Sequence, residues 1–559
     1  IGVTGGGNLT ISDLTIDGDL QGASNYHFYG IYYRNTGGII QDVTIVDVTP
    51  AVLDGLQHGI GINIENSDKA ARNITISGCT ISNYEKSAIN INQPGLTGLV
   101  TGNTLTGMGS TDVIEQFGIQ FAFGSTGSAI GNDISGNDDT RSNYHPAYYV
   151  GAGIVIYGSD NVVVQNNELH DNEAGIYVLE DTSFGYKGTD NTQIISNNLI
   201  DNAYGIFYHH RTDGSTPIGN TGSVVAFNRI LGNTTSGVCN EMIAGVSVLA
   251  ENNWWGCNAG PGGTGCDTIY GETDADPWLV LNLTSTPATV LPLGDSAVAA
   301  GLVQNSADQT PTGGTVPDGI QVNFTVPDGG SVSPTSAPTL DGEADTTFTA
   351  PIADQAYAVC ATVDNQSAIC SDVTVANVAP VAINNTYTVS EDATLTITAP
   401  GVLNNDTDAN GDVLAAVLNN GPTNGILTLN STGAFTYSPT SNFYGSDTFS
   451  YKANDGLLDS NIATVTITVT NVNDPPVAED DTVSTAEDTP LLIAESVLLA
   501  NDVNVDPDTL SVTEVSNPTN GAVMLVAGTI TFTPTADFHG TAGFDYTVSD
   551  STLTDTGHV

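Results

Sequence analysis

The chain has 559 residues, and its formal net charge at pH 7 is −53 because 62 Asp and Glu face only 9 Lys and Arg. Such a chain is repelled by phosphate backbones, which excludes nucleic acid as a partner, and it attracts cations, above all Ca²⁺. It contains no run of about 18 apolar residues, so a membrane-spanning helix is excluded, and its length predicts two to five domains.

The first half of the chain repeats a position at which Asn is followed, two residues later, by a large apolar residue. The spacings are 29, 35, 30, 31 and 25 residues, and such a period predicts a solenoid. Asn tolerates a left-handed backbone, and amides stacked coil on coil can hydrogen-bond along the axis. The repeats are Asn103/Leu105, Asn132/Ile134, Asn167/Leu169, Asn197/Leu199, Asn228/Ile230 and Asn253/Trp255, preceded without Asn by Leu14/Ile16, Val43/Ile45 and Cys79/Ile81.

A second repeated feature is a strand that starts with Gly-Ile, as at Gly175-Ile176 and Gly205-Ile206. After each Gly the side chains alternate, so we expect Tyr177 and Phe207 to point outward. With the closing segment Asn252–Gly256, these residues resemble the right-handed parallel β-helix family of bacterial secreted and surface proteins. The resemblance implies a solenoid of about nine coils over residues 1–280. It leaves function open, because the same fold serves lyases, glycosidases and adhesins.

The six cysteines indicate an oxidising compartment. Cys360 and Cys370 flank a turn symmetrically, so we expect a cross-strand disulfide between them. Cys257 and Cys266 bracket a glycine-rich loop that a disulfide would pin. The other two cysteines lie about six coils apart in the solenoid, too far to pair, and we expect both to be buried and free.

Residues 281–377 show short alternating runs, such as Ile320–Phe324 and Tyr357–Ala361, between Pro and Gly turns. This pattern predicts a β-sandwich. The segment Thr315–Gly319, followed by Val322–Phe324, resembles bacterial immunoglobulin-like domains of the invasin and intimin type. We refer to this region as the sandwich domain.

Residues 378–473 (module 1) and 474–559 (module 2) repeat each other at an interval of 96 residues, then 95 after a one-residue deletion. The linker Asn471–Pro476 joins them. The two modules resemble bacterial cadherin-like repeats, in which acidic side chains and the linker Asn-Asp bind Ca²⁺ and stiffen the junctions. Matching pairs include Val381/Val477, Glu391/Glu487, Asn405/Asn501, Phe443/Phe538 and Tyr451/Tyr546.

The segment Asp406–Asp412 places oxygen ligands at alternating positions around a Gly turn, as the first half of a calcium loop does. The twelfth position is Val417 and not Glu, which excludes a complete EF-hand, so Glu391 and Asp392 are expected to supply further ligands. The alternative is that these side chains only form turn-initiating hydrogen bonds. The expected calcium ligands are Glu391, Asp392, Asp406, Asp408, Asn410, Asp412, Asn473, Asp474, Glu487, Asp488, Asp502, Asn504, Asp506 and Asp508.

Long insertions follow two Gly-Ile strands, at residues 180–190 and 209–220. A polysaccharide lyase needs a base and a cation there, and a hydrolase needs two carboxylates at about 5–9 Å. No spacing in the sequence fixes either geometry, so no catalytic residue is assigned. If the solenoid binds a polysaccharide, the expected binding residues are Tyr177, Lys187, Phe207, His209 and Arg211.

We therefore predict an all-β, secreted cell-surface protein of bacterial or archaeal origin, with a β-helix followed by three β-sandwiches. The favoured function is adhesive or structural, as an adhesin, filament or surface-layer component stiffened by calcium, with self-association or cell-surface glycans as partners. The alternative is a polysaccharide-binding or polysaccharide-degrading enzyme, a lyase or glycoside hydrolase, with accessory sandwiches. Since Ile1 lies inside the solenoid pattern and Val559 precedes the last strand of the repeat, we expect a segment of a longer protein.

Overall fold

The computed structural model describes residues 1–18, 28–49, 59–111, 114–139, 150–181, 189–211, 221–242 and 246–559. The chain forms two compact units, one comprising residues 1–351 and 355–376 and the other residues 352–354 and 377–559. Among the described residues, helical structure is confined to α1 (Glu495–Leu498) and the 3₁₀ turn η2 (Gly401–Leu403), and no helix is long and apolar enough to cross a membrane. The all-β prediction is confirmed.

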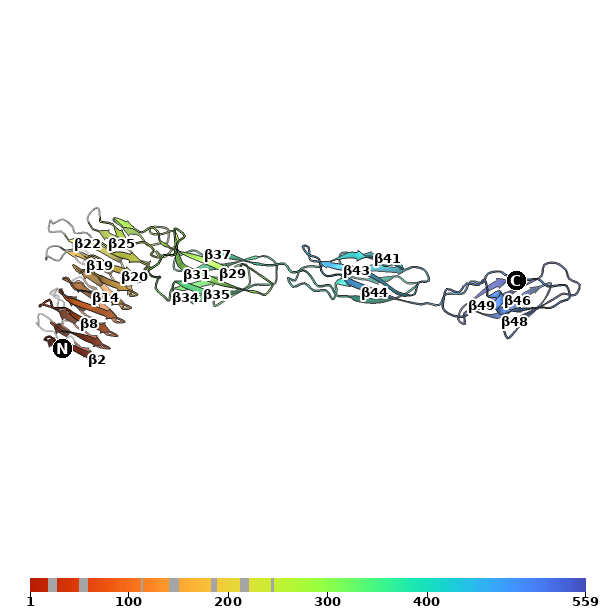
Figure 1. Ribbon diagram of the computed structural model, residues 1–559, viewed down its shortest axis with the longest axis horizontal. Helices are drawn as coiled ribbons and strands as arrows, with labels where there is room; N and C mark the ends of the chain where they lie inside the picture. Colours follow the sequence, from red (N-terminus) through yellow and green to blue (C-terminus); the bar gives the residue numbers. More distant parts are fainter. Residues whose placement is uncertain are drawn as a thin grey trace. The chain divides into compact units, whose positions relative to one another are not determined.

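The first unit begins with a parallel β-helix (Figure 1), in which each of the first eight described coils contributes one strand to each of three sheets and the last two strands extend only sheet A. Sheet A contains β1 (Gly2–Thr4), β4 (Phe28–Arg34), β7 (Gly59–Glu65), β10 (Ser87–Asn92), β13 (Phe117–Ala122), β16 (Ala152–Tyr157), β19 (Ala174–Asp181), β22 (Tyr204–Arg211), β25 (Ser236–Glu241) and β27 (Ile269–Tyr270). Sheet B contains β2 (Asn8–Ser12), β5 (Gly37–Gln41), β8 (Arg72–Ser77), β11 (Leu96–Thr101), β14 (Thr126–Ile130), β17 (Val162–Gln165), β20 (Gln193–Ile195) and β23 (Val224–Ala226). Sheet C contains β3 (Thr15–Asp17), β6 (Thr44–Val46), β9 (Thr80–Ser82), β12 (Thr104–Thr111), β15 (Asp133–Asp139), β18 (Glu168–His170), β21 (Asn198–Ile200) and β24 (Arg229–Leu231).

The core of the solenoid is built from rows of identical inward positions. Ile154, Ile176 and Ile206 are register partners on neighbouring strands of sheet A, and none of them has exposed surface. The alternation read from the sequence therefore gives the correct direction of the side chains. Cys79 and Cys239 are buried and free, as expected.

The predicted Asn positions form a continuous hydrogen-bonded ladder between sheets B and C. The Nδ2 and backbone N of Asn132 both donate to Oδ1 of Asn167 at 2.9 Å, and the same Nδ2 donates to the Val100 carbonyl at 3.0 Å. Asn132 Oδ1 in turn accepts from the backbone N and Nδ2 of Asn103, so each inner amide links its coil to the coil before it and to the coil after it. The ladder runs through Asn103, Asn132, Asn167, Asn197, Asn228 and Asn253.

The expectation that the ladder Asn itself takes the left-handed backbone is wrong. The left-handed residue is the one before it, as at Gly131 (φ 63°), Asn166 (φ 56°) and Ser196 (φ 58°). That preceding residue turns the backbone, and the turn directs the ladder amide into the interior, where Asn167 is 1% exposed.

A second ladder, which was not predicted, runs along the turn after sheet C. The backbone N and Nδ2 of Asn172 donate to Oδ1 of Asn202 at 3.0 and 3.2 Å. Its last member is Asp267, whose Oδ2 accepts from Asn233 Nδ2 at 2.6 Å. Burial raises the pKa of Asp267, and hydrogen bonds from Asn233 and Gly232 oppose that rise. The members are Asn137, Asn172, Asn202, Asn233 and Asp267.

The sandwich domain follows in the same unit, after the short pair β26 (Val248–Leu249) and β28 (Thr273–Asp274). Ala226, Phe227 and Trp254 of the solenoid share one buried cluster with its core, including Val316. The expected disulfides Cys257–Cys266 and Cys360–Cys370 are both present. One sheet contains β29 (Leu279–Thr286), β31 (Asp295–Asn305), β35 (Glu343–Thr349) and β33 (Ser331–Ser333), and the other β30 (Thr289–Val290), β37 (Ile369–Val375), β36 (Ala356–Thr362), β32 (Gln321–Thr325) and β34 (Ser336–Pro338).

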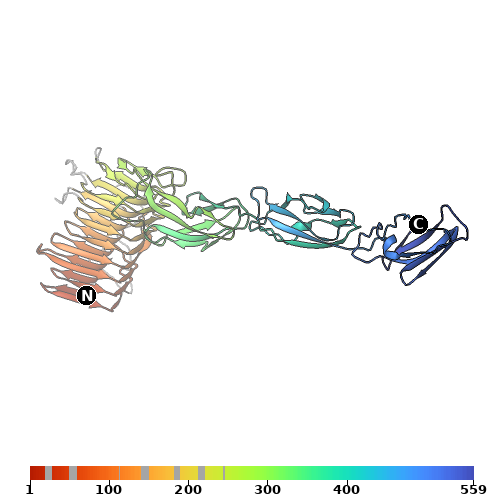
Figure 2. The ribbon, with the colours of Figure 1, turned by 45° about the vertical axis from the view of Figure 1, so that its right-hand side comes forward.

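The second unit contains the two modules, each built from two sheets (Figure 2). The sheets of each module enclose a core that contains aromatic side chains. In module 1 one sheet contains β38 (Asn385–Ser390), β44 (Ala463–Thr470), β43 (Gly445–Asn454) and β40 (Ala415–Asn420), and the other β39 (Leu395–Ile397), β42 (Phe435–Pro439) and β41 (Gly425–Leu429). In module 2 the sheets are β45 (Leu491–Ala494), β48 (Thr529–Pro534) and β47 (Gly521–Val526), and β46 (Ser511–Thr519), β49 (Gly543–Ser549) and β50 (Thr554–His558).

Candidate functional sites

Two of the predicted polysaccharide-binding residues are buried. Tyr177 and Phe207 are outward register partners on β19 and β22, with stacked rings whose centroids are 5.4 Å apart. They are only 4% and 2% exposed and belong to an apolar cluster on the outer side of sheet A that includes Val155. The expectation that these two rings are available to bind a polysaccharide is therefore wrong, because the alternation of a strand predicts the direction of a side chain but not whether it is exposed.

Of the other predicted binding residues, His209 and Arg211 lie in the last part of β22. His209 is 7% exposed, and its Nδ1 lies 3.4 Å from Oε2 of Glu241 on β25. Arg211 is the last residue of β22, and only its backbone is described. Lys187 lies outside the described residues.

The same ends of β19 and β22 bring together acids and imidazoles whose pairing was not predicted from the sequence. Nδ1 of His210 lies 3.0 Å from Oε2 of Glu180, and the two side chains are 0% and 1% exposed. Tyr157 donates its hydroxyl proton to Oδ2 of Asp181 at 3.1 Å. The pairing could have been predicted from the alternation of β19 and β22, because it puts Glu180 and His210 in the inward row at matching positions. An acid and a base in contact can exchange a proton. Because both side chains are enclosed and out of reach of a substrate, we assign this pair a structural role, in which it links two neighbouring coils.

In module 1, part of the predicted calcium loop gathers carboxylates. Oδ1 of Asp408 accepts from the backbone N of Asn410 at 2.8 Å and of Asp412 at 3.2 Å, whereas its buried Oδ2 has no hydrogen-bond partner among the described residues. One carboxylate oxygen from each of Asp408, Asp412 and Asp455 lies within 4.8 Å of the others. Partial burial raises the pKa of Asp412, and the charges of Asp354, Asp408 and Asp455 raise it further.

At the junction between the modules, acidic residues come from both modules and the linker. The backbone N of Asp474 donates to Oδ2 of Asp506 at 2.6 Å, and Val472 N donates to Oε1 of the buried Glu391 at 2.7 Å. Partial burial raises the pKa of Asp474, and the charges of Asp392 and Asp506 add to the rise. Four carboxylates therefore lie in one region of the junction without a basic partner among the described contacts.

The contacts at the start of module 2 repeat those at the start of module 1. Asn377 Nδ2 donates to Asp455 at 3.1 Å, as Asn473 Nδ2 donates to Asp550 at 2.8 Å. Val378 N donates to Oδ1 of Asn410, in the position where Asp474 N donates to Asp506. The sequence interval of 95 residues between Asp455 and Asp550 was the signal that identifies these two unpredicted acids.

Other predicted ligands are used inside the modules. Asp406 accepts hydrogen bonds from Ile383 N at 2.7 Å and from the Tyr451 hydroxyl at 2.9 Å, and Asp502 accepts from Glu479 N and Tyr546 in the same way. Both carboxylates therefore fix the start of the module and are separate from the junction clusters.

Glu391 and Asp392 do not complete the Asp406–Asp412 loop, contrary to expectation. Asp406 contacts Ile383, just before β38, whereas Glu391 follows the end of this six-residue strand, about 20 Å away. In module 2, Asp488 accepts a hydrogen bond from the backbone N of Asp537. Asn504 has different partners: its Oδ1 accepts from the backbone N of Asp506, and its Nδ2 donates to the Asp508 carbonyl.

Comparison with known proteins assigns the regions of the chain. Family models match a right-handed β-helix region at residues 1–222, a bacterial cadherin-like domain at 377–471 and a cadherin-like domain at 472–559. No curated protein matches the chain. The chain thus combines a right-handed β-helix with cadherin-like domains. This combination of domains indicates an extracellular or cell-surface protein.

Several solved structures align with parts of this chain at low identity and low TM-score. An endo-fucoidan hydrolase from glycoside hydrolase family 107 is 18% identical, with 48% of this chain and 42% of that one covered and a TM-score of 0.17. Invasin, a bacterial integrin-binding protein, is 15% identical, with 50% and 60% covered and a TM-score of 0.25. The protocadherin GammaB4 extracellular domain is 14% identical, with 52% and 53% covered and a TM-score of 0.24. The chain spans less than two thirds of the length of each.

Proposed function

We propose that this chain is a structural or adhesive component of the cell surface whose cadherin-like modules are stiffened by calcium. The observation that carries the proposal is the acidic junction between the modules, where partial burial raises the pKa of Asp474 and the negative charges of Asp392 and Asp506 raise it further. Ca²⁺ takes six to eight oxygen ligands and would relieve this repulsion.

The chemistry of the junction fits calcium better than zinc or a transition metal. The available donors are carboxylate and amide oxygens, with Glu391 and Asp392 from module 1, Asn473 and Asp474 from the linker, and Asp506 from module 2. Hard oxygen donors without Cys or His favour Ca²⁺. Because the ligands come from two modules and their linker, bound calcium would restrict motion between the modules.

Calorimetry of the whole chain tests this proposal. In differential scanning calorimetry, millimolar Ca²⁺ is expected to raise the melting temperature of the module transitions relative to the protein in chelator, because an ion bound only by the folded state stabilises it. The transition of the first unit is the internal control and is expected to stay unchanged. Identical thermograms in Ca²⁺ and chelator would reject calcium stiffening.

The adhesive role requires a partner, for which we propose cell-surface glycans or a second copy of the chain. An array of immobilised glycans probed with the calcium-loaded chain tests the first, and sedimentation velocity over a range of protein concentrations tests the second. A chain that binds no glycan and stays monomeric with Ca²⁺ would leave only the structural role.

A second candidate, polysaccharide binding with degradation, is favoured by His209 and Glu241 at the ends of β22 and β25. Nδ1 of His209 lies 3.4 Å from Oε2 of Glu241, whereas Glu180 and His210 form the enclosed pair described above. Incubation with acidic polysaccharides, followed by ultraviolet absorbance for unsaturated products and an assay for new reducing ends, separates lyase, hydrolase and inactive protein.

A further inference from the structure

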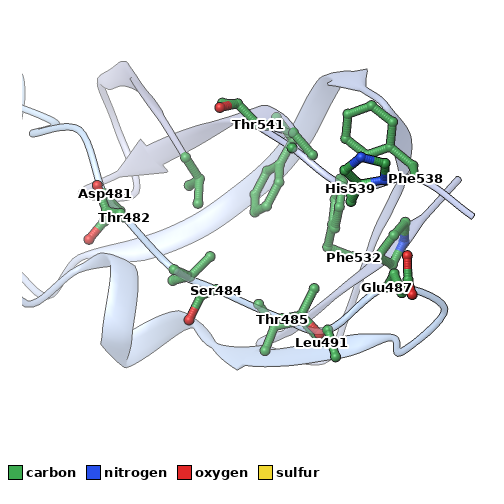
Figure 3. Close-up of a pocket in the computed structure, with 18 of the residues that line it drawn as sticks. Asp481, Thr482, Ser484, Thr485, Glu487, Leu491, Phe532, Phe538, His539 and Thr541 are labelled. Carbon is green, nitrogen blue, oxygen red and sulfur yellow. The ribbon is translucent and has the colours of Figure 1, made fainter.

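A groove of module 2 is explained by the repeat itself. Thr485 lies on one side of it and Thr541 on the other (Figure 3). In module 1 the corresponding place is filled by β44, and the backbone hydrogen bonds between Phe544 and Val559 repeat a pairing of β43 with β44. The groove is therefore a strand position of the cadherin-like repeat.

A second groove lies inside the first unit, between sheet C of the solenoid and the sandwich domain. It has a volume of about 550 Å³. Asp133 and Glu168 border it on the solenoid side, and Asp318 and Asp341 border it on the sandwich side. None of the described residues that line it is Lys, Arg or His. The nearest imidazole, of His170, has its Nε2 3.2 Å from Oδ1 of Asp133 and carries at most one positive charge against four carboxylates.

The acids of the solenoid side belong to one outward row. Asp133, Glu168, Asn198 and Arg229 are successive register partners and are the first residues of β15, β18, β21 and β24. The residue that follows each of them is a fully buried Ile or Leu, so the row itself points outward. Neighbouring strands are about 4.8 Å apart, which places the carboxylates of adjacent coils within reach of one planar group.

The sandwich side of the groove is fixed against the solenoid. Ser196 Oγ donates to the carbonyl oxygen of Thr315 at 2.5 Å. Gly314 packs so closely on Phe227 that a Cβ atom would come within 2.7 Å of the ring. These contacts fix the loop 314–318, so the two sides of the groove keep their separation.

At the end of the row, the solenoid itself supplies a cation to the sandwich domain. The guanidinium of Arg229 forms a two-point ion pair with Asp364 and so bridges the two domains. In the groove, Asp133 and Glu168 of the row are acids, and Asp318 and Asp341 on the opposite side are acids as well. The same bridge therefore lacks a guanidinium in the groove.

Glu168 and Asn198 show this lack in their surroundings. Burial raises the pKa of Glu168, and the hydrogen bond from Asn198 Nδ2 at 2.6 Å and the positive charge of Arg229 oppose the rise. Oδ1 of Asn198 is buried and has no hydrogen-bond partner among the described residues. A ligand that brings positive charge and N–H donors would stabilise both side chains.

We propose that this groove binds an arginine side chain from a basic segment of a partner protein. A guanidinium carries five N–H donors in one plane and forms paired hydrogen bonds with carboxylates. It can contact Glu168 and Asp133 on neighbouring coils and Asp318 on the opposite side. The exposed amide of Asn166 in the lining offers hydrogen bonds to the backbone of the bound segment. The volume lies in the range of ligand sites and exceeds that of a single metal ion.

The charge of the chain favours a different protein as the partner. A second copy offers only 9 Lys and Arg beside 62 acids, and Arg72 and Arg229 are already paired with Asp68 and Asp364. A neutral glycan would leave the carboxylates uncompensated, and none of the described lining residues is an aromatic ring on which a sugar could stack. The groove gives the chain a means of attachment that is separate from the acidic clusters of the modules.

Isothermal titration calorimetry of the whole chain with an acetylated and amidated Gly-Arg-Gly peptide tests the proposal. Saturable binding is expected, with the same affinity in millimolar Ca²⁺ and in chelator. A peptide with citrulline in place of arginine keeps the shape of the side chain without its charge, and it is expected to bind at least about tenfold more weakly.

Variants on both sides of the groove locate the bound arginine. Glu168→Gln keeps the acceptor for Asn198, and Asp318→Asn keeps the acceptor for the backbone N of Asp341. Each removes one charge and is expected to weaken binding by about tenfold. Asp345→Asn removes an exposed acid of the sandwich domain outside the groove and is expected to bind normally. Melting temperatures equal to that of the parent chain verify that the variants are folded.

The same titrations can overturn the proposal. Absence of binding, equal binding of the citrulline peptide, or an unchanged affinity of Glu168→Gln or Asp318→Asn would do so. Displacement of the peptide by Ca²⁺ would make the groove a metal site instead, and tighter binding of a glucosamine oligomer would make it a site for an amino sugar. None of these results bears on calcium stiffening, which is measured by the melting of the modules.

Discussion

Arg229 of β24 and Asp364 of the sandwich domain form a two-point ion pair across 135 residues of sequence. Nε of Arg229 donates to Oδ2 at 3.0 Å, and Nη2 donates to Oδ1. Trp254 Nε1 donates to the same Oδ2 at 2.7 Å. The Asp364 side chain is 4% exposed and Trp254 is fully buried, so this carboxylate anchors the sandwich domain to the solenoid.

Asp364→Ala is expected to uncouple the sandwich domain from the solenoid. The change leaves Arg229 and Trp254 without their acceptor in a buried contact, which costs roughly 3–5 kcal/mol of unfolding free energy. Calorimetry of the variant should show an earlier, separate transition for the sandwich domain. Asp345→Ala removes an exposed acid of the same domain and should reproduce the parent thermogram. Equal thermograms for both variants would contradict the anchoring role.

Two adjacent asparagines in one turn are expected to respond differently to substitution. Asn167 is a buried ladder member, and Asn167→Ala leaves the Asn132 donors unpaired, at a cost of roughly 2–5 kcal/mol. Asn166 is exposed with a φ of 56°, so Asn166→Ala should cost about 1 kcal/mol and Asn166→Gly almost nothing. Urea unfolding followed by circular dichroism measures the series. A larger loss at residue 166 than at residue 167 would contradict the ladder as the source of stability.

Of the two Asn ladders in the solenoid, only one was predicted from the sequence. The first ladder was predicted because Asn and a following apolar residue recur together. The second was missed, although Asn137, Asn172, Asn202 and Asn233 repeat at 35, 30 and 31 residues, the same steps as in the first ladder. At its last position Asp267 replaces Asn. The carboxylate retains an acceptor oxygen, so the hydrogen bond is kept although the residue type differs.

The junction clusters were only partly predictable, for a physical reason. The alternating acids of Asp406–Asp412 were visible, but Asp455 lies 43 residues beyond Asp412 and approaches it only because β43 returns to the same end of module 1. Likewise, Glu391 was assigned to the Asp406–Asp412 loop of its own module because the two are close in the sequence. In the structure, β38 runs away from that loop, and Glu391 at its end contacts the linker before module 2. Sequence gives the ligand chemistry, and the assignment of each acid to a cluster requires strand topology.

The acidic clusters at the start of module 1 and at the start of module 2 are expected to bind calcium with different affinities. Module 1 has Val378 and Asn410 where module 2 has Asp474 and Asp506, and calcium affinity rises with the number of charged ligands. Asp474→Val, which copies the residue of module 1, should weaken calcium binding at the start of module 2 by about tenfold. Isothermal titration calorimetry measures the change.

The reciprocal substitution provides the control for the calcium prediction. Val378→Asp should strengthen binding at the start of module 1, and Glu514→Gln, at an exposed position of β46 outside the predicted ligand set, should have little effect. If Asp474→Val leaves every binding step unchanged, the linker carboxylate is not a ligand.

The stability of the first unit is expected to fall as pH rises towards 9, because of Glu173. Burial raises the pKa of Glu173 from 4.5 to about 8, and the charges of Asp139 and Asp138 add to the rise. A pKa that is higher in the folded state means that the protonated carboxyl stabilises the fold. This contribution is full below pH 4.5 and is lost as pH rises through about 8. The loss should be roughly 2–4 kcal/mol, measured by thermal melting between pH 5 and 9.

Glu173→Gln should remove this pH dependence while keeping the fold. Oε2 of Glu173 accepts from Gly151 N at 2.8 Å, and a Gln side chain retains that acceptor without a charge. The solenoid already tolerates an amide in this setting, because the buried Gln116, immediately before β13, accepts from Met108 N at 2.8 Å. Glu343→Gln, at an exposed position of the same unit, should keep the pH dependence of the parent chain. A Glu173→Gln variant whose melting temperature still falls as steeply between pH 5 and 9 would show that another group controls the transition.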